Sequence, residues 1–240
     1  MVESPVGASL GSPLGAVIGA NRGIGLGVAK EMLRRGWSVI ATARQPDAAK
    51  DLAALSRAHP GKLEILALDI ADPAGLDAFA AAMTARTLDA LLINAGVAGP
   101  DHRSATVATE AEIGALMYTN AIGPIRLARA VAGSVRRDTG VIGFTSSVMG
   151  SVALNAGGHE LYRASKAALN SLSRGLWPEL KGRGLTLLSL HPGWVRTGMG
   201  GSAAPVGIEE SAQGMVNMLE RERGRHRHAF IDYKGAEFAW

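Results

Sequence analysis

The amino-acid sequence predicts an α/β fold, in which one doubly wound domain contains a parallel seven-stranded sheet with helices on both faces. Short apolar runs alternate with longer helical patterns along the chain. The runs are apolar at nearly every position, which is typical of parallel strands buried on both faces. No internal repeat, linker or low-complexity tract divides the 240 residues, and this length suits one domain with a sizeable core.

The first strand is expected at Leu14–Ile18, after a loose lead-in at residues 1–12, so that the domain spans residues 13–240. A helix is expected at Ile24–Arg35, because its apolar residues share one face and Gly36 ends it. The later elements are expected, in order, as a strand at Ser38–Ala43, a helix at Ala48–Arg57, a strand at Leu63–Leu68, a helix at Pro73–Ala85, a strand at Leu88–Ile93, a helical region at about Thr109–Arg136 with a bend near Gly123-Pro124, a strand at Gly140–Ser146, a helix at about His159–Lys181, a strand at Leu185–Leu190, a helix at Glu209–Glu220 and a strand at Ala229–Asp232.

Composition and charge argue against several classes of protein. Cysteine is absent, so disulfides and thiolate chemistry are excluded, and no membrane-length apolar run or signal-peptide pattern is evident. We therefore expect a cytoplasmic protein without membrane contact. Much of the net charge of +4 lies in Arg221–His228, a run without aromatic residues; we expect a solvated loop there and no nucleic-acid contact. The run offers two histidines but no third ligand, so no metal site is expected.

A glycine-rich turn follows the first strand, in the segment Ile18-Gly19-Ala20-Asn21-Arg22-Gly23-Ile24-Gly25. In a doubly wound sheet, ligands bind beyond the carboxyl ends of the strands. Glycines permit a sharp turn and the close approach of a pyrophosphate, and the helix N-terminus that follows offers free N–H groups. The turn is common for backbone reasons alone, but its place between a strand and a helix favours a dinucleotide site.

The end of the second strand bears on the choice of cofactor. NAD-binding proteins typically hold an acidic residue there, on the adenosine ribose, whereas this chain has Arg44 and no acid before Asp47. The planar guanidinium of Arg44 suits a phosphate, and Arg22 in the glycine turn offers a second one. We predict that NADP(H) is preferred over NAD(H); the alternative is that both arginines are ordinary surface residues.

The segment Tyr162-Arg163-Ala164-Ser165-Lys166 places a phenol and an ammonium at i and i+4 on one helix face. The glycine turn, Asn94-Ala95-Gly96, this segment and Pro192-Gly193 occur in an order that resembles the short-chain dehydrogenase/reductase family over nearly the whole chain.

Further motifs narrow the resemblance. The stretch His191-Pro192-Gly193-Trp194-Val195, the turn Met199-Gly200-Gly201 and the ending Asp232-Tyr233-x-Gly235 are similar to the branch that contains C-factor-like proteins and sniffer-type carbonyl reductases. The resemblance implies a Rossmann-type fold and an NADPH-dependent oxidoreductase that reduces an aldehyde or ketone reversibly to an alcohol.

The resemblance also implies the roles of four catalytic residues. Tyr162 would donate a proton to the carbonyl oxygen, which Ser147 would polarise, while Ser146 faces inward. Lys166 would hold the nicotinamide ribose and, with the oxidised cofactor, lower the pKa of Tyr162 from about 10 by about three units, which requires roughly 4 kcal/mol. Asn120 would support a water chain to Lys166.

The family's cofactor contacts map onto a larger set of residues. They are Gly19, Asn21, Arg22, Gly23, Ile24 and Gly25 in the glycine turn, Arg44 at the 2′-phosphate, Asp69 and Ile70 beside the adenine, Asn94, Ala95 and Gly96 under the adenosine ribose, Tyr162 and Lys166 at the nicotinamide ribose, and Pro192, Gly193, Val195 and Thr197 along the nicotinamide and phosphates. Three residues depart from the family pattern: Ile18, Ile93 and Gly198. The first two are expected to loosen the turn by about 1 kcal/mol for each hydrogen bond lost.

The substrate is expected to be a small apolar carbonyl compound. Met149, Leu154, His159, Trp194 and Met199 are the candidate pocket walls, although His159 also fits a solvent-facing residue at a helix start. The glycine- and alanine-rich segment at about 197–208 is expected to be a substrate loop that acts as a mobile lid.

A homodimer or homotetramer is expected from the resemblance and from five leucines that we expect to extend beyond the cover of the sheet. These are Leu116, Leu127, Leu169, Leu172 and Leu176. A dehydratase or epimerase is disfavoured because the chain ends too early for the substrate domain of those relatives, and a serine hydrolase because Ser147 lacks a nucleophile elbow. A non-enzymatic NADP-binding sensor or signalling protein of the C-factor type stays open as an alternative.

Overall fold

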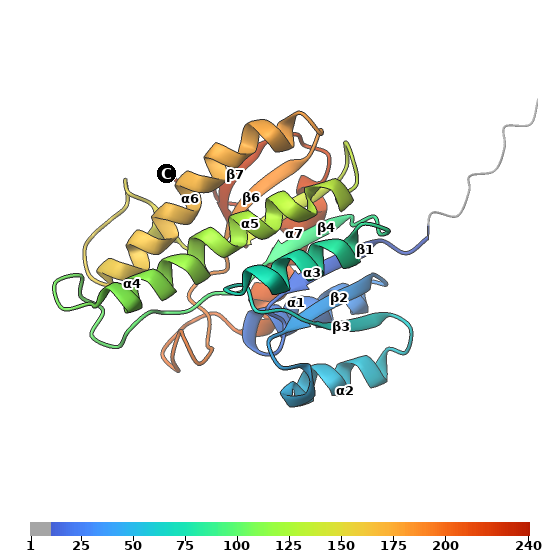
Figure 1. Cartoon of the computed structure of the whole chain (residues 1–240), viewed down its shortest axis with the longest axis horizontal. Helices are drawn as coiled ribbons and strands as arrows, with labels where there is room; N and C mark the ends of the chain where they lie inside the picture. Colours follow the sequence, from blue (N-terminus) through green and yellow to red (C-terminus); the bar gives the residue numbers. More distant parts are fainter. Residues whose placement is uncertain (1–10) are drawn as a thin grey trace, which may run out of the picture.

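The computed structural model describes residues 11–240 and contains one parallel sheet of seven strands in the order β3-β2-β1-β4-β5-β6-β7 (Figure 1). Residues 1–10 of the expected lead-in lie outside the described part. The strands are β1 (Leu14–Ile18), β2 (Ser38–Ala43), β3 (Leu63–Ala67), β4 (Ala90–Ile93), β5 (Val141–Thr145), β6 (Thr186–His191) and β7 (His228–Asp232). The winding reverses between β1 and β4, as in a doubly wound sheet.

Helices cover both faces of this sheet, so the predicted fold class is confirmed. The longer helices are α1 (Gly23–Arg34), α2 (Lys50–Ala58), α3 (Pro73–Met83), α4 (Glu110–Met117), α5 (Gly123–Val131), α6 (Glu160–Lys181) and α7 (Ile208–Glu222). Helices α1, α2 and α7 pack on one face, and α3, α5 and α6 on the other. The expected elements match these within a few residues at their ends.

The strand side chains alternate between two apolar clusters, one on each face. In β1, Ala16 and Ile18 belong to the cluster under α3, α5 and α6, whereas Val17 belongs to the cluster under α1 and α7. This is the two-residue period of a strand with both faces buried. It explains why the strands read as continuous apolar runs in the sequence.

The helical region before β5 changes its hydrogen-bond pattern just before Gly123-Pro124, where a bend was expected. A π-helical turn at Tyr118–Ile122 joins α4 to α5. Such turns insert an extra residue into the helix and occur often at functional sites. Here the turn carries Asn120, whose side chain is fully buried.

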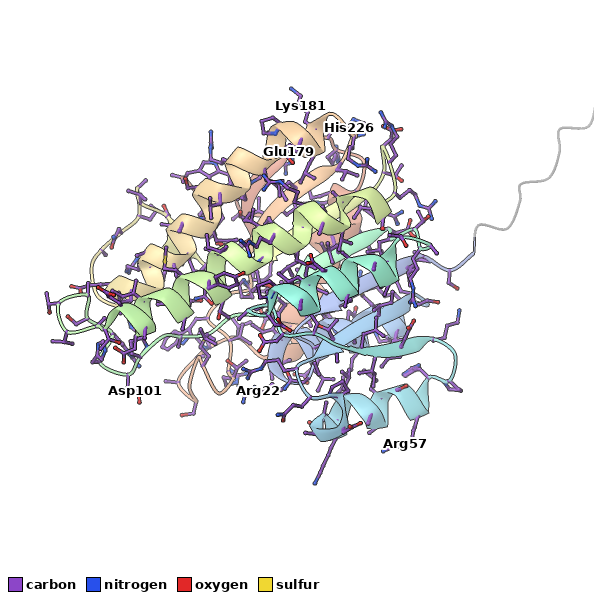
Figure 2. All side chains as sticks on the ribbon, viewed as in Figure 1. Arg22, Arg57, Asp101, Glu179, Lys181 and His226 are labelled. Carbon is purple, nitrogen blue, oxygen red and sulfur yellow. The ribbon has the colours of Figure 1, made fainter. Side chains whose placement is uncertain are left out.

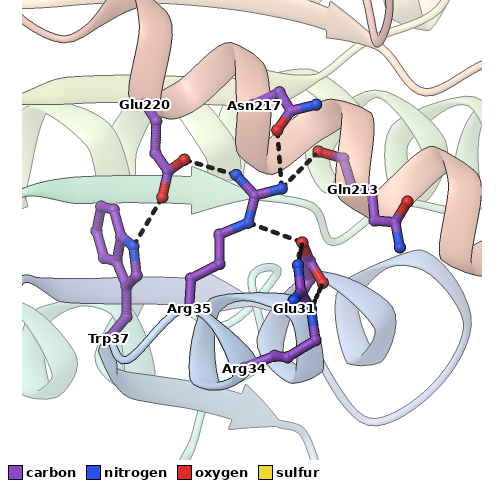
Figure 3. Close-up of polar contacts among 7 residues, drawn as sticks. All are labelled: Glu31, Arg34, Arg35, Trp37, Gln213, Asn217 and Glu220. Atoms are coloured by element: carbon purple, nitrogen blue, oxygen red, sulfur yellow. Dashed lines mark hydrogen bonds and ion pairs between the residues drawn. The ribbon is translucent and has the colours of Figure 1, made fainter.

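Helices α1 and α7 are joined by a polar cluster around Arg35 (Figure 3). The Arg35 guanidinium donates to Glu31 Oε1 at 2.7 Å, to Glu220 Oε2 at 2.6 Å and to Asn217 Oδ1 at 2.8 Å. Trp37 Nε1 donates to the other oxygen of Glu220 at 3.0 Å. These contacts hold α1, the helix that begins at the glycine turn, against α7.

The buried carboxylate of Asp89 connects three segments at the edge of the sheet where the strands begin. Asp89 is 4% exposed and accepts hydrogen bonds from the Leu14 amide, from Arg136 Nε at 2.8 Å and from Arg223 Nη2 at 2.6 Å. Burial opposes ionisation of Asp89, but these donors outweigh it and leave the pKa of the carboxyl below its ordinary value. Arg223, from the basic run, therefore has an internal partner.

The end of the chain braces the loop that follows β5, which the sequence did not indicate. The Ser151 hydroxyl donates to the Ala239 carbonyl at 2.7 Å, and the Ala153 amide donates to the Trp240 carbonyl at 3.1 Å. The Trp240 ring lies 5.3 Å from the ring of Phe230, centroid to centroid. The tail thus connects β7 to the loop that follows β5.

The expected interface of exposed leucines is wrong for four of its five members. Leu116, Leu127, Leu169 and Leu176 are at most 2% exposed, because neighbouring helices and the sheet cover them within one chain. Only Leu172 reaches the surface, at 36% exposed. Amphipathic spacing identified an apolar helix face, but it could not say that the same chain covers it.

Within residues 11–240, no helix is both long enough and apolar enough to cross a membrane.

Candidate active site

The predicted site residues lie where the strands end, on the left-hand side of Figure 1. Parallel strands bring their carboxyl ends to one edge, so the segments after β1, β4, β5 and β6 meet there although they are far apart in sequence. The long helix α6 packs beside the turn that follows β5 and brings two more candidate residues, Tyr162 and Lys166, to the same edge.

The glycine turn between β1 and α1 has the geometry of a phosphate cradle. Gly19 adopts φ +80°, and a side chain on it would begin 2.9 Å from the Ala95 Cα. A side chain on Gly25 would begin 2.2 Å from the Gly19 carbonyl oxygen, so only glycine allows the helix to start this close to the strand. No side chain caps the first turn of α1 and no acid lies in it, which leaves its N–H groups and positive dipole end for an anion.

The turn is braced differently from the expected family pattern. The Gly19 amide donates to Thr42 Oγ1 at 3.0 Å, and Asn94 Nδ2 donates to the Gly19 carbonyl at 3.0 Å. Ile18 and Ile93 are 1% and 2% exposed and fill the apolar cluster behind the turn. Thr42 and Asn94 therefore hold the turn at two points.

Arg22 and Arg44 both extend into solvent, near the glycine turn and the end of β2 respectively. Figure 2 places Arg22 beside the loop that follows β6. Neither guanidinium makes a hydrogen bond or an ion pair with residues 11–240. Both cations can therefore turn toward a phosphate without breaking a contact inside the protein.

Tyr162 and Lys166 lie on one face of α6, next to the end of β5. Lys166 is 3% exposed, and its Nζ donates to the Thr145 carbonyl oxygen at 2.8 Å. The same Nζ lies 5.8 Å from the centre of the Tyr162 ring. Ser147 lies two residues after the end of β5. Its hydroxyl accepts a hydrogen bond from the Met149 amide at 3.1 Å.

The protein alone raises the pKa of the Tyr162 phenol, whereas the expected lowering includes the oxidised cofactor and stays a prediction. Burial raises the pKa of Tyr162 to about 12, and hydrogen bonding to Ser147 only partly opposes this shift. Burial also lowers the pKa of Lys166 to about 8. The ammonium is directed at the Thr145 carbonyl, so desolvation decides both shifts.

Asn120 joins three segments of the site from the π-helical turn. Its Oδ1 accepts from the Val97 amide at 2.8 Å, and its Nδ2 donates to the Val97 carbonyl at 2.9 Å and to Ser165 Oγ at 3.0 Å. Gly96 lies between Asn120 and Lys166. A side chain on Gly96 would begin 3.2 Å from Asn120 Oδ1 and 3.5 Å from Lys166 Nζ. Asn120 thus fixes the loop after β4 against α6.

The other predicted cofactor residues line the same edge. Ile70 is buried, and its carbonyl approaches α5 so closely that only glycine fits at position 123, while Asp69 Oδ1 accepts from the Ala71 amide. The Ser211 hydroxyl donates a hydrogen bond to the Pro192 carbonyl oxygen at 2.7 Å. Thr197 lies near the glycine turn, 3.6 Å from where a side chain on Gly23 would begin.

The expected substrate residues lie on the loops that follow β5 and β6. Leu154, Trp194 and Met199 are 49%, 56% and 52% exposed, which places apolar surface at the rim of the site. His159 is exposed at the start of α6, and its Nε2 lies 3.5 Å from Arg103 Nη1. This supports the solvent-facing alternative for His159.

The segment expected to be a lid is held at its base. Val195 and Val206 form a bridge, and Arg196 Nη1 donates to the Ala204 carbonyl at 2.9 Å. Gly198 has open space around it, so its departure from the family pattern disturbs no packing.

The residues present fit a dinucleotide. A glycine cradle that side chains would fill, an uncapped helix N-terminus and two unpaired cations match its pyrophosphate and additional phosphate. Sequence reasoning missed one contributor, the Thr145 carbonyl that accepts from Lys166, because a backbone carbonyl leaves no signal in a sequence.

Comparison with known proteins follows the same lines. The sequence profile of the short chain dehydrogenase family matches residues 15–205, which is more than half of the chain. The chain belongs to this family. It is an oxidoreductase of the short-chain dehydrogenase type, as the ordered motifs predicted.

Two solved structures and one curated relative illustrate the similarity. A short-chain dehydrogenase/reductase from Burkholderia multivorans, crystallised with bound NADP, has a TM-score of 0.92 and 40% identity, over 95% of this chain and 100% of that one. The carbonyl reductase Sniffer of D. melanogaster has a TM-score of 0.82 and 31% identity, over 96% of this chain and 100% of that one. C-signal of Myxococcus xanthus is 36% identical over 169 residues, which cover 68% of this chain and 99% of the relative. The predicted branch is confirmed.

Proposed function

We propose that this short-chain dehydrogenase is an NADPH-dependent carbonyl reductase, which converts an aldehyde or ketone reversibly to an alcohol. The observation that carries the proposal is the meeting of Ser147, Tyr162 and Lys166 at the end of β5. The Ser147 side chain lies close enough to the phenol to lower the pKa of Tyr162, and the buried ammonium lies 5.8 Å from the centre of the phenol ring. Two hydroxyls directed at one oxygen suit a carbonyl that must gain a proton.

In the reduction direction, Tyr162 donates its proton to the carbonyl oxygen, which Ser147 polarises with a second hydrogen bond. The hydride for the carbonyl carbon is what bound NADPH supplies. The C=O π electrons take the proton, so the products are an alcohol and NADP⁺, and the phenolate then regains a proton from solvent. Because burial raises the pKa of Tyr162 to about 12, the phenol holds its proton at neutral pH, which is the form that reduction needs.

Lys166 and Asn120 support this chemistry. The Lys166 ammonium, held by the Thr145 carbonyl, would contact the nicotinamide ribose of a bound cofactor and would favour the phenolate that oxidation of an alcohol requires. Asn120 keeps the loop after β4 against α6 through its bonds to Val97 and Ser165. It leads the water chain to Lys166 that the family resemblance implies.

The cofactor is NADP(H), in preference to NAD(H). The carboxylate that would bind the ribose of NAD is missing at the end of β2, where Arg44 is exposed and has no partner among residues 11–240. Arg22 adds a second cation at the glycine turn. The B. multivorans relative with bound NADP supports this choice.

The substrate is a small apolar aldehyde or ketone. The loops that follow β5 and β6 reach the rim of the site and expose large apolar side chains, of which Val152, Trp194 and Met199 are more than half exposed. An apolar rim of this kind binds hydrocarbon groups by removing them from water. The carbonyl reductase activity named for Sniffer agrees with this class of substrate.

C-signal, as a relative, favours a second candidate, a non-enzymatic NADP-binding sensor or signalling protein. The experiment that separates the two is a panel of aldehydes and ketones, paired by size and polarity, with NADPH oxidation followed. A reductase turns over at least one apolar carbonyl and loses that turnover in Tyr162→Phe. Tight NADPH binding without turnover across the panel would favour the sensor.

A further inference from the structure

Asn170 lies one turn beyond Lys166 on α6 and is 3% exposed. Its position continues the four-residue spacing of Tyr162 and Lys166, so all three side chains leave the same face of the helix. The proposed mechanism gives Asn170 no part, yet both ends of its amide are engaged.

The two bonds of the Asn170 amide flank Ser147. Its Oδ1 accepts from the Ser146 hydroxyl at 2.8 Å, directly before Ser147. Its Nδ2 donates to the Gly150 carbonyl at 3.2 Å, at the end of the short turn η4 (Val148–Gly150) that Ser147 begins. One amide therefore holds the segment on both sides of the serine.

Close packing also holds the turn η4 against α6. A side chain on Gly150 would begin 2.8 Å from the Lys166 carbonyl carbon and 2.9 Å from Lys166 Cβ. The turn thus rests directly on the backbone of α6 at Lys166, and the Asn170 amide prevents it from sliding along the helix. Buried amides with both ends bonded are rigid elements, because an unmade bond there is costly.

We infer that Asn170 is a positioning residue, which sets the Ser147 hydroxyl relative to the Tyr162 phenol by gripping both sides of the serine's turn. The inference rests on the proposed catalytic role of Ser147. Because α6 carries Tyr162 and also holds the turn, the distance between the two hydroxyls is fixed by one helix. Asn170 acts only through Ser147 and touches neither substrate nor cofactor.

The test is a double-mutant cycle between Asn170→Ala and Ser147→Ala in the NADPH-loaded enzyme, with any accepted carbonyl. Asn170→Ala is expected to lower kcat/KM by about tenfold, the size expected when the hydrogen bond from Ser147 to the carbonyl oxygen is lost, while the Kd for NADPH changes by less than about twofold. In the Ser147→Ala background, Asn170→Ala is expected to change kcat/KM by less than about twofold, because there is no hydroxyl left to position.

Ser173→Ala is the matched control. Ser173 is a fully buried hydroxyl on the same helix and bonds the Asn170 backbone carbonyl at 2.7 Å, but it makes no bond to the turn. It should keep wild-type kcat/KM. Hydrogen exchange adds a readout independent of activity: the Met149, Gly150 and Ser151 amides should exchange faster in Asn170→Ala and not in Ser173→Ala. If Asn170→Ala does not fold, Ser146→Ala, which removes one of the two bonds, should show the same pattern with a smaller loss.

Full additivity in the cycle, unchanged kcat/KM in Asn170→Ala, or an equal loss in Ser173→Ala would overturn the inference. Wild-type turnover in Ser147→Ala would instead overturn the proposed role of Ser147, and the inference with it. The two failures are therefore distinguishable, because only the second leaves the serine variant active.

Discussion

Arg44→Ala should weaken the binding of NADPH far more than that of NADH. Arg44 is exposed and has no partner in residues 11–240, so its removal leaves no internal group unpaired and the fold should keep its stability. A charge-assisted hydrogen bond contributes about 1.5–3 kcal/mol, which corresponds to between about tenfold and about a hundredfold in Kd. Solvent exposure screens the contact, so the lower end is expected at about 0.15 M salt.

The assay is a titration of both cofactors against the wild type, Arg44→Ala and the control Arg57→Ala. Arg57 is likewise an exposed arginine without a partner among the described residues, at the far end of α2 (Figure 2). It controls for the loss of one positive charge. The reasoning is refuted if wild-type protein binds NADH as tightly as NADPH, or if Arg44→Ala weakens both cofactors equally.

Three further predictions concern stability and assembly. Asp89→Ala should lower the free energy of unfolding by about 3 kcal/mol in urea titrations, because it leaves the partners of a buried ion pair without their carboxylate; a loss below about 1 kcal/mol would contradict this. Burial lowers the pKa of Lys166 from 10.5 to about 8. Between about pH 8 and pH 10.5, Lys166 therefore carries a proton in the unfolded chain that it has lost in the folded protein. The contribution of Lys166 to the free energy of unfolding rises with pH across that window. Lys166→Met should therefore stabilise the fold by up to about 3 kcal/mol at pH 7 and by less at pH 10, and an unchanged unfolding midpoint at both pH values would refute it. We expect a dimer or tetramer, although of the five leucines only Leu172 is exposed; light scattering that gives the mass of one chain at micromolar concentration would count against it.

The fold could be predicted from the sequence because its signals are local. Each strand is an apolar run, each helix has an apolar face, and the end of α1 is marked by Gly36, which adopts φ +85°. The glycine turn could be predicted for the same reason, since the steric limits on Gly19 and Gly25 arise within a few residues of chain and one neighbouring loop. The ordered family motifs then placed the catalytic candidates on these elements.

Properties that depend on tertiary contacts could not be read in this way. The spacing of Tyr162 and Lys166 gives one helix face, but not that Lys166 would be directed at the Thr145 carbonyl and leave burial to raise the pKa of Tyr162. Likewise, Ile18 lacks the hydroxyl that the family pattern has at this position. The Thr42 hydroxyl on the adjacent strand accepts a hydrogen bond from the Gly19 amide of the glycine turn, and the sequence did not indicate this contact. Asn170 meets a segment that lies 20 to 24 residues earlier in the chain, and only the packing of η4 on α6 reveals that contact.

The central claim is that Tyr162 is the proton donor, and the most direct measurement of it is the turnover of Tyr162→Phe with NADPH and any accepted carbonyl. The change removes the hydroxyl and keeps the ring, so NADPH affinity should stay within a few fold. Turnover should fall by about 10²–10⁴, the range for one positioned acid or base. Tyr118→Phe is the matched control, because that hydroxyl bonds Arg126 on an exposed helix face and its loss should leave turnover unchanged. Near-normal turnover in Tyr162→Phe, with the cofactor bound, would contradict the account.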